Sequence, residues 1–432
     1  AAVVGYDTRF LSRQFAEVAA GTLAAAGRRV LLADAPCPTP ASSCQVIASS
    51  AAYAVVITAS HNPSIFNGIK VKDASGSSAG PDLTARCEGA IPSDPPEALG
   101  LEEGRRRGLI QVASFAAAHA DRLSRMVDLA AIRAAGFKIV ADPMHGACGR
   151  LLEALLSGGA ASVTTIRAVP DPLFGGLHPE PVETNLEALR EAVLSAGASV
   201  GFATDGDGDR IGAFDEMGRF VSPLRIAPLI AWSLIKKGRR GPLAKTFANT
   251  VLLDRIARAY GLPFSVFPVG FKFIAGQLRS GRLLLGAEES GGIGVAGFIP
   301  ERDGTLVSLL ILQAMVDEGK PLSEMVADLT RTFGELHYSR RDLPCPPERG
   351  RRLVERLKAR PPATIGGLRV TGGDNLDGLK LLFGDDGWVL FRASGTEPVL
   401  RVYSEAPTPG RLDAVMAEAV SLVEEAGHDL GS

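Results

Sequence analysis

Short apolar runs alternate along the chain with stretches in which apolar residues recur at helical spacing. Residues 3–6 form such a run, and residues 12–26 follow with a helical spacing that stops at Gly27. Further apolar runs cover residues 29–33 and 54–58, and the second of these leads directly into a polar loop. Strands that alternate with helices favour parallel or mixed sheets covered by helices. We therefore predict an α/β fold for this part of the chain.

Two further segments repeat this order before the pattern changes near Tyr338. We expect the next strands and helices at residues 138–141, 151–156, 163–167, 186–196 and 200–203, and then at 228–236, 283–285 and 305–318. Beyond Tyr338, prolines separate short predicted strands at residues 368–371, 379–383, 388–392 and 400–404, and a final helix covers about residues 409–426. The pattern thus predicts three α/β units followed by a smaller α+β domain.

Composition and charge narrow the possible functions. The 432 residues carry a net charge of −2, which argues against a basic nucleic-acid-binding protein. No stretch of 18 apolar residues predicts a membrane-spanning helix, and the first residues lack the basic segment of a signal peptide. The sequence also opens without Met, so we do not take Ala1 as the native start. We expect neither a nucleic-acid partner nor a membrane partner.

The cysteines indicate the redox environment of the protein, and the glycines and prolines indicate how many tight loops it has. Cys37, Cys44, Cys87, Cys148 and Cys345 are scattered and form no Cys-x-x-Cys pair. We interpret them as free thiols of a cytoplasmic protein rather than as disulfides or zinc ligands. The 49 glycines and 28 prolines follow no period, which excludes collagen and predicts many tight loops.

The first loop with chemical potential is Thr-Ala-Ser-His-Asn-Pro at residues 58–63, directly after a predicted strand. A serine at the carboxyl end of such a strand lies where α/β sheets hold reactive groups. His61 could assist proton transfer beside Ser60, and Lys70 could neutralise an anion there. The alternative is an ordinary turn in which the side chains bond the backbone. A Gly-x-Ser-x-Gly motif is absent from the sequence, which disfavours an α/β-hydrolase.

The second loop places Asp205, Asp207 and Asp209 at a spacing of two, with glycines between them. Three clustered carboxylates repel one another, and a hard divalent cation such as Mg²⁺ relieves that repulsion. A calcium-binding EF-hand loop is disfavoured because its sixth position requires Gly and here is Arg210, and because this loop follows a strand. A solvated Asp/Gly turn remains the other reading.

Two more loops carry groups suited to a phosphosugar. Glu288 and Ser290 stand among glycines and could bind sugar hydroxyls, although a surface acidic turn has the same composition. In the fourth loop, phosphate could be held by Arg392, Ser394, Gly395 and Thr396. An ordinary capping loop is the alternative there. Together the four loops imply a phosphosugar substrate and phosphoryl transfer through a serine, in a cleft where the units meet.

These motifs and their order resemble the α-D-phosphohexomutase family, which includes phosphoglucomutases, phosphomannomutases and phosphoglucosamine mutases. Smaller matches support the resemblance over nearly the whole chain: Gly-Tyr-Asp-Thr-Arg at 5–9, Asp-Pro-Met-His-Gly at 142–146, Pro-Val-Gly-Phe-Lys at 268–272 and Pro-Glu-Arg-Asp-Gly at 300–304. The resemblance implies three related α/β domains with mixed sheets plus a C-terminal α+β domain, arranged around a central cleft. We place these four domains at residues 1–135, 136–219, 220–337 and 338–432.

The resemblance also implies a role for each loop. Ser60 would carry a phosphoryl group, and Mg²⁺ would be held by Asp205, Asp207, Asp209 and a phosphoserine oxygen of Ser60. The transferring group would be flanked by Lys70 and Arg210, with Lys70 and His61 as candidates for proton transfer. The substrate would be bound by Lys272, Glu288, Ser290, Arg392, Ser394, Gly395 and Thr396.

We therefore predict a phosphohexomutase that interconverts the 1- and 6-phosphates of glucose, mannose or both, with a hexose 1,6-bisphosphate as intermediate and activator. Three alternatives remain: a phosphoglucosamine mutase, a metal-dependent sugar phosphatase with a serine nucleophile, and a non-catalytic sugar-phosphate-binding protein. The sugar loop favours glucose or mannose because it lacks the Ser-Gly-His ending expected of phosphoglucosamine mutases. The sequence does not indicate an oligomeric state.

Two departures from the family pattern stand out. Family members usually have a segment before the first strand with an Arg that reaches the active site, and we expect that Arg upstream of the given sequence. Arg9 belongs to a different motif, so we do not assign it this role. Some members also have a His where this sequence has Gly292.

Overall fold

The computed structural model describes residues 1–384, 387–394 and 398–429. The chain forms two compact units. The first comprises residues 1–244, 262–265 and 270–326, and the second comprises residues 245–261, 266–269 and 327–432. Among the described residues, no helix is long and apolar enough to cross a membrane.

The first sheet has the strand order β4-β3-β1-β2-β5. Its strands are β1 (Ala2–Tyr6), β2 (Val30–Ala33), β3 (Tyr53–Ile57), β4 (Ile69–Lys72) and β5 (Ile110–Ala113). All neighbours pair in parallel except the edge strand β4, which runs antiparallel to β3. This edge matters for the site, because the antiparallel return brings Lys70 of β4 back beside Val56 of β3.

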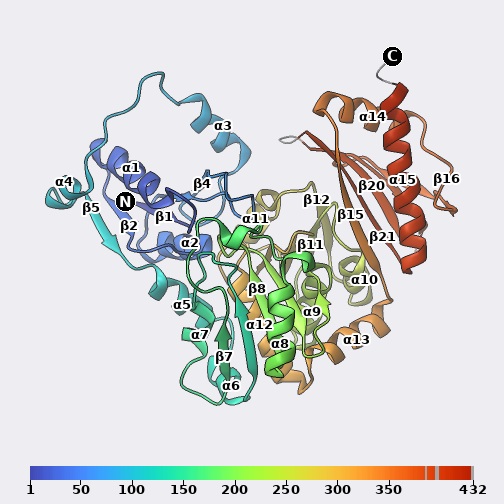
Figure 1. Cartoon of the computed structure of the whole chain (residues 1–432), viewed down its shortest axis with the longest axis horizontal. Helices are drawn as coiled ribbons and strands as arrows, with labels where there is room; N and C mark the ends of the chain where they lie inside the picture. The colour runs from blue at the N-terminus through green and yellow to red at the C-terminus, as the bar shows by residue number, and fades with distance from the viewer. Residues whose placement is uncertain (385–386, 395–397, 430–432) are drawn as a thin grey trace. The chain divides into compact units, whose positions relative to one another are not determined.

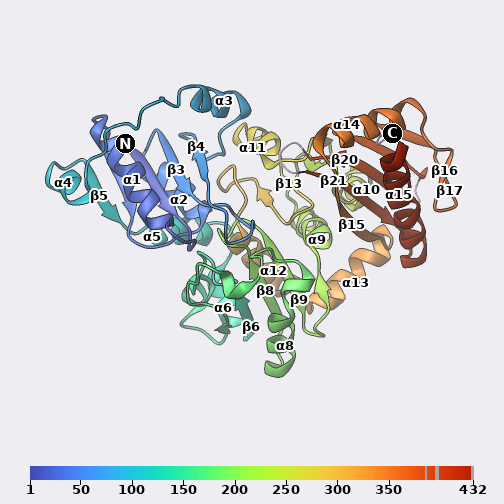
Figure 2. The same ribbon diagram turned by 45° about the horizontal axis from the view of Figure 1, so that its top comes forward.

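Small buried residues let α1 pack closely on this sheet. The helices of this region are α1 (Ser12–Ala25), α2 (Thr39–Ala48), α3 (Pro81–Gly89), α4 (Leu101–Arg106) and α5 (Ala116–Ser124), and Figure 2 shows α1 and α2 beside the strands. Ala16, Ala20 and Ala24 lie one helical turn apart on α1, and all three are buried. Their small side chains let α1 approach the sheet closely.

The second sheet has the order β10-β9-β8-β6-β7 and mixes parallel with antiparallel pairs. Its strands are β6 (Lys138–Asp142), β7 (Ser162–Thr165), β8 (Val200–Thr204), β9 (Ile211–Asp215) and β10 (Phe220–Val221). The helices here are α6 (Leu129–Ala134), α7 (Leu151–Leu156) and α8 (Glu187–Ala196). Figure 1 shows α8 over β8, where Gly201 leaves room for Val193.

The third sheet has the order β12-β11-β13-β14, and the division between the two units passes through β11 and β12. The strands are β11 (Leu243–Thr246), β12 (Phe264–Phe267), β13 (Leu285–Ala287) and β14 (Ile293–Val295). The helices are α9 (Pro223–Lys236), α10 (Leu252–Ala259), α11 (Phe271–Arg279), α12 (Gly304–Glu318) and α13 (Leu322–Phe333). The α12 helix is apolar around its circumference, and eleven of its residues are buried.

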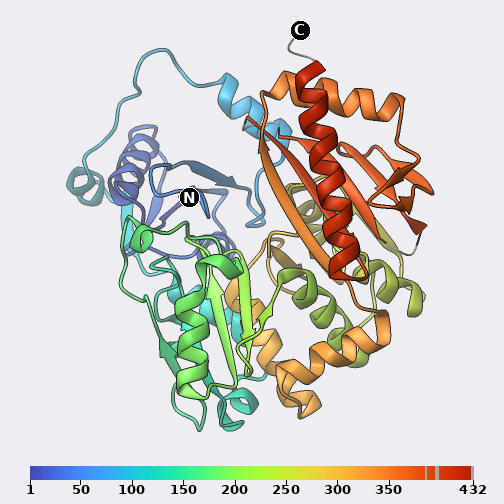
Figure 3. The ribbon, with the colours of Figure 1, turned by 45° about the vertical axis from the view of Figure 1, so that its right-hand side comes forward.

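The second unit contains an antiparallel sheet with the order β15-β21-β20-β19-β18. Its strands are β15 (His337–Pro344), β18 (Gly372–Asp374), β19 (Leu379–Leu382), β20 (Trp388–Ala393) and β21 (Val399–Ala406), and a separate pair joins β16 (Thr364–Ile365) to β17 (Leu368–Arg369). Figure 3 shows the helix α15 (Pro409–Asp429) lying along this sheet, and α14 (Pro347–Ala359) packs into the same core.

Alternate residues of β20 face two different cores. Val389 and Phe391 pack toward α14 and α15, whereas Trp388 and Leu390 pack against Phe247 at the end of β11. Lys380 of β19 is buried in this second core. Its Nζ donates to the carbonyl of Phe247 at 2.9 Å, and its ammonium lies 3.7 Å from the centre of the Trp388 ring.

Burial first and the neighbouring charge of Lys245 second lower the pKa of Lys380 to about 7. The carboxylates that oppose this shift belong to Glu405, Asp254 and Asp374. The buried amine therefore gives up its proton far more readily than an exposed lysine does.

The predicted fold class is confirmed: three related α/β regions with mixed sheets precede an α+β region. The helix expected from Pro228 begins earlier, at Pro223, and contains Pro228 in its interior, where one backbone hydrogen bond is lost. The helix α2, which Pro40 enters in its first turn, was not predicted. All five cysteines are free thiols, as predicted.

Candidate active site

Ser60 follows β3 in a tightly held loop. Its backbone has a φ of 54°, a left-handed conformation that few non-glycine residues adopt. The Ser60 amide donates to Thr58 Oγ1 at 2.9 Å, and the Ser60 hydroxyl donates to Asp205 Oδ2 at 2.8 Å. The structure therefore places the predicted serine against the first carboxylate of the predicted metal-binding loop.

The three aspartates lie in the turn between β8 and β9. All three are fully buried, and one carboxylate oxygen from each lies within 4.8 Å of the others. Gly206 lets this turn approach the serine loop, because a Cβ there would lie 2.7 Å from the Ser60 carbonyl oxygen. Gly208 has a φ of 75°, which Gly adopts without a Cβ penalty.

Lys70 and Arg302 balance the charge of these carboxylates. Lys70 Nζ lies 2.6 Å from Asp207 Oδ2 and 3.0 Å from Asp209 Oδ2, and Arg302 Nη2 donates to Asp209 Oδ2 at 2.5 Å. Burial by itself would lower the pKa of Lys70, but the two carboxylates raise it above its ordinary value. Burial would likewise raise the pKa of Asp207, but the Lys70 ammonium holds that pKa below its usual range.

The donor set fits a hard divalent cation. Asp207 Oδ1 and Asp209 Oδ1 are buried and have no hydrogen-bond partner among the described residues. Burial, followed by the charges of Asp207 and Asp209, raises the pKa of Asp205 well above its ordinary value. Clustered oxygen ligands with unused lone pairs are what a divalent cation coordinates. These three residues could therefore hold a metal ion.

His61 and Arg210 flank the cluster. Burial first and the charge of Arg210 second lower the pKa of His61 well below its ordinary value. His61 Nδ1 is buried without a hydrogen-bond partner in the described part of the chain. The Arg210 amide donates to Asp205 Oδ1 at 3.1 Å, and its guanidinium lies 3.8 Å from Glu180 and 3.9 Å from Asp209. The structure thus brings both predicted residues beside the carboxylates.

Glu288 joins the same charge network through Arg302. It lies at the end of β13, is buried, and accepts a hydrogen bond from Arg302 Nη1 at 2.7 Å. Burial raises its pKa although Arg302 and Arg210 oppose the shift. A Cβ at Gly292 would overlap Arg302 Cδ and lie 2.8 Å from Glu288 Oε2. This position of Arg302 therefore requires a residue without a side chain at 292.

The remaining predicted binding residues lie elsewhere in the described structure. Ser290 is half-buried in the same loop as Glu288. Lys272 is exposed on the first turn of α11, with its ammonium 5.3 Å from the Phe273 ring. No hydrogen bond in the described part of the chain joins Ser290 or Lys272 to the aspartates.

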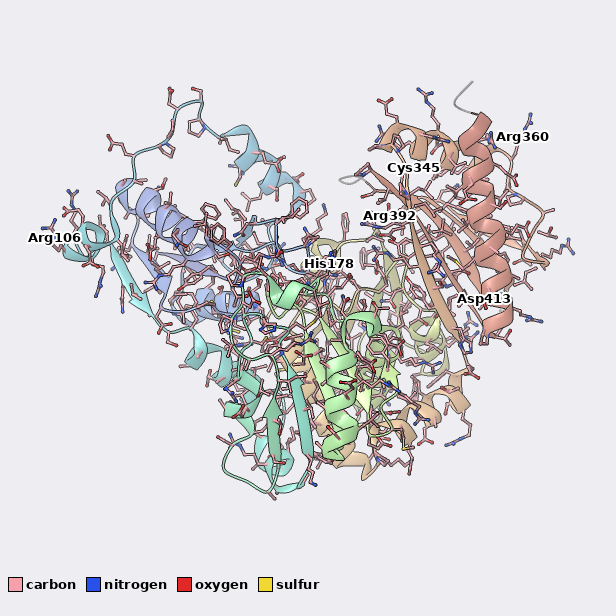
Figure 4. All side chains as sticks on the ribbon, in the orientation of Figure 1. Arg106, His178, Cys345, Arg360, Arg392 and Asp413 are labelled. Carbon is pink, nitrogen blue, oxygen red and sulfur yellow. The ribbon has the colours of Figure 1, made fainter. Side chains whose placement is uncertain are left out.

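The predicted phosphate loop belongs to the second unit. Figure 4 shows Arg392 on its sheet; Arg392 Nε donates to Asp377 Oδ2 at 2.9 Å. Ser394 is buried, and its amide donates to the Val399 carbonyl. Gly395 and Thr396 lie outside the described residues.

Sequence reasoning assigned no site role to three residues that contact the aspartates or the serine loop. Thr39 Oγ1 donates to Asp207 Oδ2 at 2.5 Å, Arg302 bridges Asp209 and Glu288, and Arg9 bonds the serine loop. Arg9 and Arg302 stand in two of the short motifs that the chain shares with the resembling family. This shared motif was the only signal in the sequence for either residue. Thr39 stands between prolines in a segment that resembles an ordinary turn.

Comparison with known proteins gives the relationship of the chain. Four domain families described as phosphoglucomutase/phosphomannomutase domains match it: domain I at residues 1–96, domain II at 117–218, domain III at 223–333 and the C-terminal domain at 349–422. The Thermococcus kodakarensis phosphoglucomutase/phosphomannomutase is 31% identical over 424 residues, which are 98% of this chain and 90% of the relative. The chain belongs to the phosphoglucomutase/phosphomannomutase family.

Other members of the phosphoglucomutase/phosphomannomutase family carry different names. The Halorhodospira halophila phosphoglucosamine mutase is 31% identical over 434 residues, covering 99% of this chain and 88% of the relative. A Thermus thermophilus structure assigned as a phosphomannomutase has a TM-score of 0.87 and 35% identity, covering 98% of this chain and 90% of that one. The predicted family membership is therefore confirmed, and these relatives are named as mutases.

Proposed function

We propose that the protein interconverts the 1- and 6-phosphates of glucose, mannose or both through a phosphoserine at Ser60. The observation that carries this proposal is the hydrogen bond from the Ser60 hydroxyl to Asp205, which is one of a cluster of three buried carboxylates. Those carboxylates are themselves paired with Lys70 and Arg302. A serine in this position can exchange a phosphoryl group beside fixed positive charge, which phosphoryl transfer requires.

Asp205, Asp207 and Asp209 would hold Mg²⁺ together with an oxygen of phosphorylated Ser60. When bound, the cation neutralises negative charge on the transferring phosphoryl group. Lys70 and Arg210 flank these carboxylates and would contact the oxygens of the same group. They thereby orient the group for in-line attack and limit the repulsion between phosphoserine and a phosphorylated substrate.

The reaction consists of two phosphoryl transfers. In the first, the free substrate hydroxyl attacks the phosphoserine and passes its proton to a protein group, a new P–O bond forms, the P–Oγ bond breaks, and Ser60 Oγ takes up a proton as it leaves. In the second, the Ser60 hydroxyl gives up that proton and attacks the other phosphate of the resulting bisphosphate, the P–O bond to the sugar breaks, and a proton returns to the oxygen of the departing sugar. His61 and Lys70 are the proposed proton carriers because they lie beside Ser60 and the aspartates.

The sugar and its second phosphate need separate contacts. We assign the sugar hydroxyls to Glu288 and Ser290, with Lys272 as a further contact. The phosphate that is not transferred is assigned to the loop with Arg392, Ser394, Gly395 and Thr396, because Arg and hydroxyl donors suit a phosphate. That phosphate is on C1 in one half of the reaction and on C6 in the other, so the loop must recognise phosphate itself.

Phosphoglucosamine mutase is the second candidate, since relatives of equal identity carry that name. Turnover of the 1-phosphates of glucose, mannose and glucosamine should be compared with Mg²⁺ and a hexose 1,6-bisphosphate present. We expect glucose or mannose phosphate to be isomerised, and Ser60→Ala to abolish the reaction. Preferred turnover of glucosamine phosphate would support the second candidate. Net release of inorganic phosphate instead of an isomer would reject both in favour of a phosphatase.

A further inference from the structure

Arg9 lies directly beneath the serine loop and has no exposed side-chain surface. Its Nη2 donates to the carbonyl oxygens of Ser60 at 2.7 Å and Asn62 at 2.6 Å. Its Nη1 donates to the carbonyl oxygens of Pro63 at 2.8 Å and Phe66 at 2.9 Å. One guanidinium group therefore binds four carbonyls of a seven-residue segment that has no regular secondary structure.

Asp7 connects Arg9 to the Ser60 amide by a second route. Arg9 Nε lies 3.2 Å from Asp7 Oδ2, and Thr58 Oγ1 donates to that same oxygen at 2.7 Å. Thr58 Oγ1 in turn accepts a hydrogen bond from the Ser60 amide. The backbone of Ser60 is thus bound on both sides, at its carbonyl by Arg9 and at its amide by Thr58.

These contacts explain how Ser60 keeps its left-handed backbone. Such a conformation costs about 1–3 kcal/mol in a non-glycine residue, and it persists only where the surroundings impose it. The Phe174 ring lies 5.0 Å from the Arg9 guanidinium carbon and also lies against Gly206 of the aspartate turn. Arg9 is therefore held between the serine loop and a residue that contacts the metal-binding turn.

We propose that Arg9 is a positioning residue that holds the Ser60 backbone, and with it Ser60 Oγ, in place beside Asp205 during both phosphoryl transfers. This inference rests on the proposed function. Arg9 acts through the backbone of the loop and is not assigned any contact with substrate. A displacement of about 1 Å at a reacting atom can slow a reaction about 100-fold, so the loss should appear in kcat rather than in KM.

Arg9→Lys tests the proposal because it keeps the charge but replaces the planar fork of donors with a single ammonium. One ammonium has three N–H donors and cannot reach carbonyls on both sides of the guanidinium. We divide kcat by the fraction of protein molecules whose Ser60 can be phosphorylated. We expect this normalised kcat to fall about 10- to 100-fold. KM and the Mg²⁺ concentration for half-maximal activity should stay within about twofold.

Arg133→Lys is the matched control. Arg133 is half-buried, and its Nε and Nη2 both donate to the Leu155 carbonyl, away from the aspartates. This variant should keep the wild-type kcat. Thr58→Val serves as the second variant if Arg9→Lys fails to fold. It removes the acceptor of the Ser60 amide hydrogen bond with little change in shape, and it should also lower kcat at unchanged KM.

Hydrogen–deuterium exchange over residues 58–68 provides a readout that does not need turnover. Arg9→Lys should exchange faster in this segment, while the rest of the first sheet exchanges as in wild type. Normal normalised kcat in folded Arg9→Lys, or unchanged exchange, would overturn the inference. If wild-type protein lacks mutase activity, the proposed function fails, and the exchange result alone decides whether Arg9 holds the loop.

Discussion

Gly292 offers a direct test of the charge network around the aspartates. Replacing it with Ala adds one methyl group whose carbon would overlap Arg302 Cδ and lie 2.8 Å from Glu288 Oε2. Ordinary contacts of a Cβ begin at 3.4 Å, so the Arg302 side chain must move. The backbone of Gly292 does not have a positive φ, and Ala is therefore compatible with its conformation.

The expected cost follows from the bonds that Arg302 makes. Its bonds to Asp209 and Glu288 are charge-assisted, and each is worth about 1.5–3 kcal/mol. Losing both should destabilise the first unit by at least about 3 kcal/mol, because two buried carboxylates lose a counter-ion. In a unit of this size that corresponds to a fall in the midpoint of thermal unfolding of about 5 °C.

Gly276→Ala is the matched control for this substitution. Gly276 lies inside α11, and a Cβ there meets no atom within 4 Å. Ala should therefore stabilise the helix by about 0.5–1 kcal/mol. Scanning calorimetry of both variants should show the two effects with opposite signs. A midpoint for Gly292→Ala that stays at the wild-type value would refute the assignment of Arg302 to this position.

Three further predictions concern the metal, the phosphate loop and the second core. Chelation of divalent cations, or Asp207→Ala, should abolish turnover while the far-ultraviolet circular dichroism stays unchanged; activity that survives both would exclude the proposed metal site. Arg392→Ala should raise KM at least about tenfold with a smaller change in kcat, because about 1.5–3 kcal/mol of charge-assisted binding is lost. Folding lowers the pKa of Lys380 from 10.5 to about 7. Between these pH values the unfolded chain binds one proton more than the folded chain, so the free energy of unfolding should rise with pH by about 1.4 kcal/mol per pH unit. Lys380→Met should remove this rise in urea titrations that follow Trp388 fluorescence in a Trp232→Phe background, and an equal pH slope in both proteins would contradict the assignment.

Local patterns carried much of the information about the fold. The apolar spacing that predicts the first helix over residues 12–26 corresponds to Ala16, Ala20 and Ala24, which face the sheet. The aspartate turn was also recognisable because its three carboxylates and its glycines are consecutive. Such features depend on neighbours in the sequence, and a single sequence displays them directly.

Beyond the contacts that the family resemblance implied, the sequence did not reveal pairs of residues that lie far apart along the chain. Arg302 stands 93 residues from Asp209, and Arg9 stands 51 residues from Ser60. Each arginine stands in a short motif, but the motif does not name its partner, since the partner is supplied by the fold. Gly292 illustrates the same limit, because its lack of a side chain gains meaning only when Arg302 occupies the space beside it.

The central claim is that Ser60 accepts and donates the phosphoryl group. The most direct measurement is mass spectrometry of the protein after incubation with isotopically labelled glucose 1,6-bisphosphate and Mg²⁺. The account predicts one labelled phosphoryl group on the peptide that contains Ser60, its loss when unlabelled hexose monophosphate is added, and no label in Ser60→Ala. A label on another residue, or a wild-type protein that catalyses the isomerisation without ever carrying the label, would contradict it.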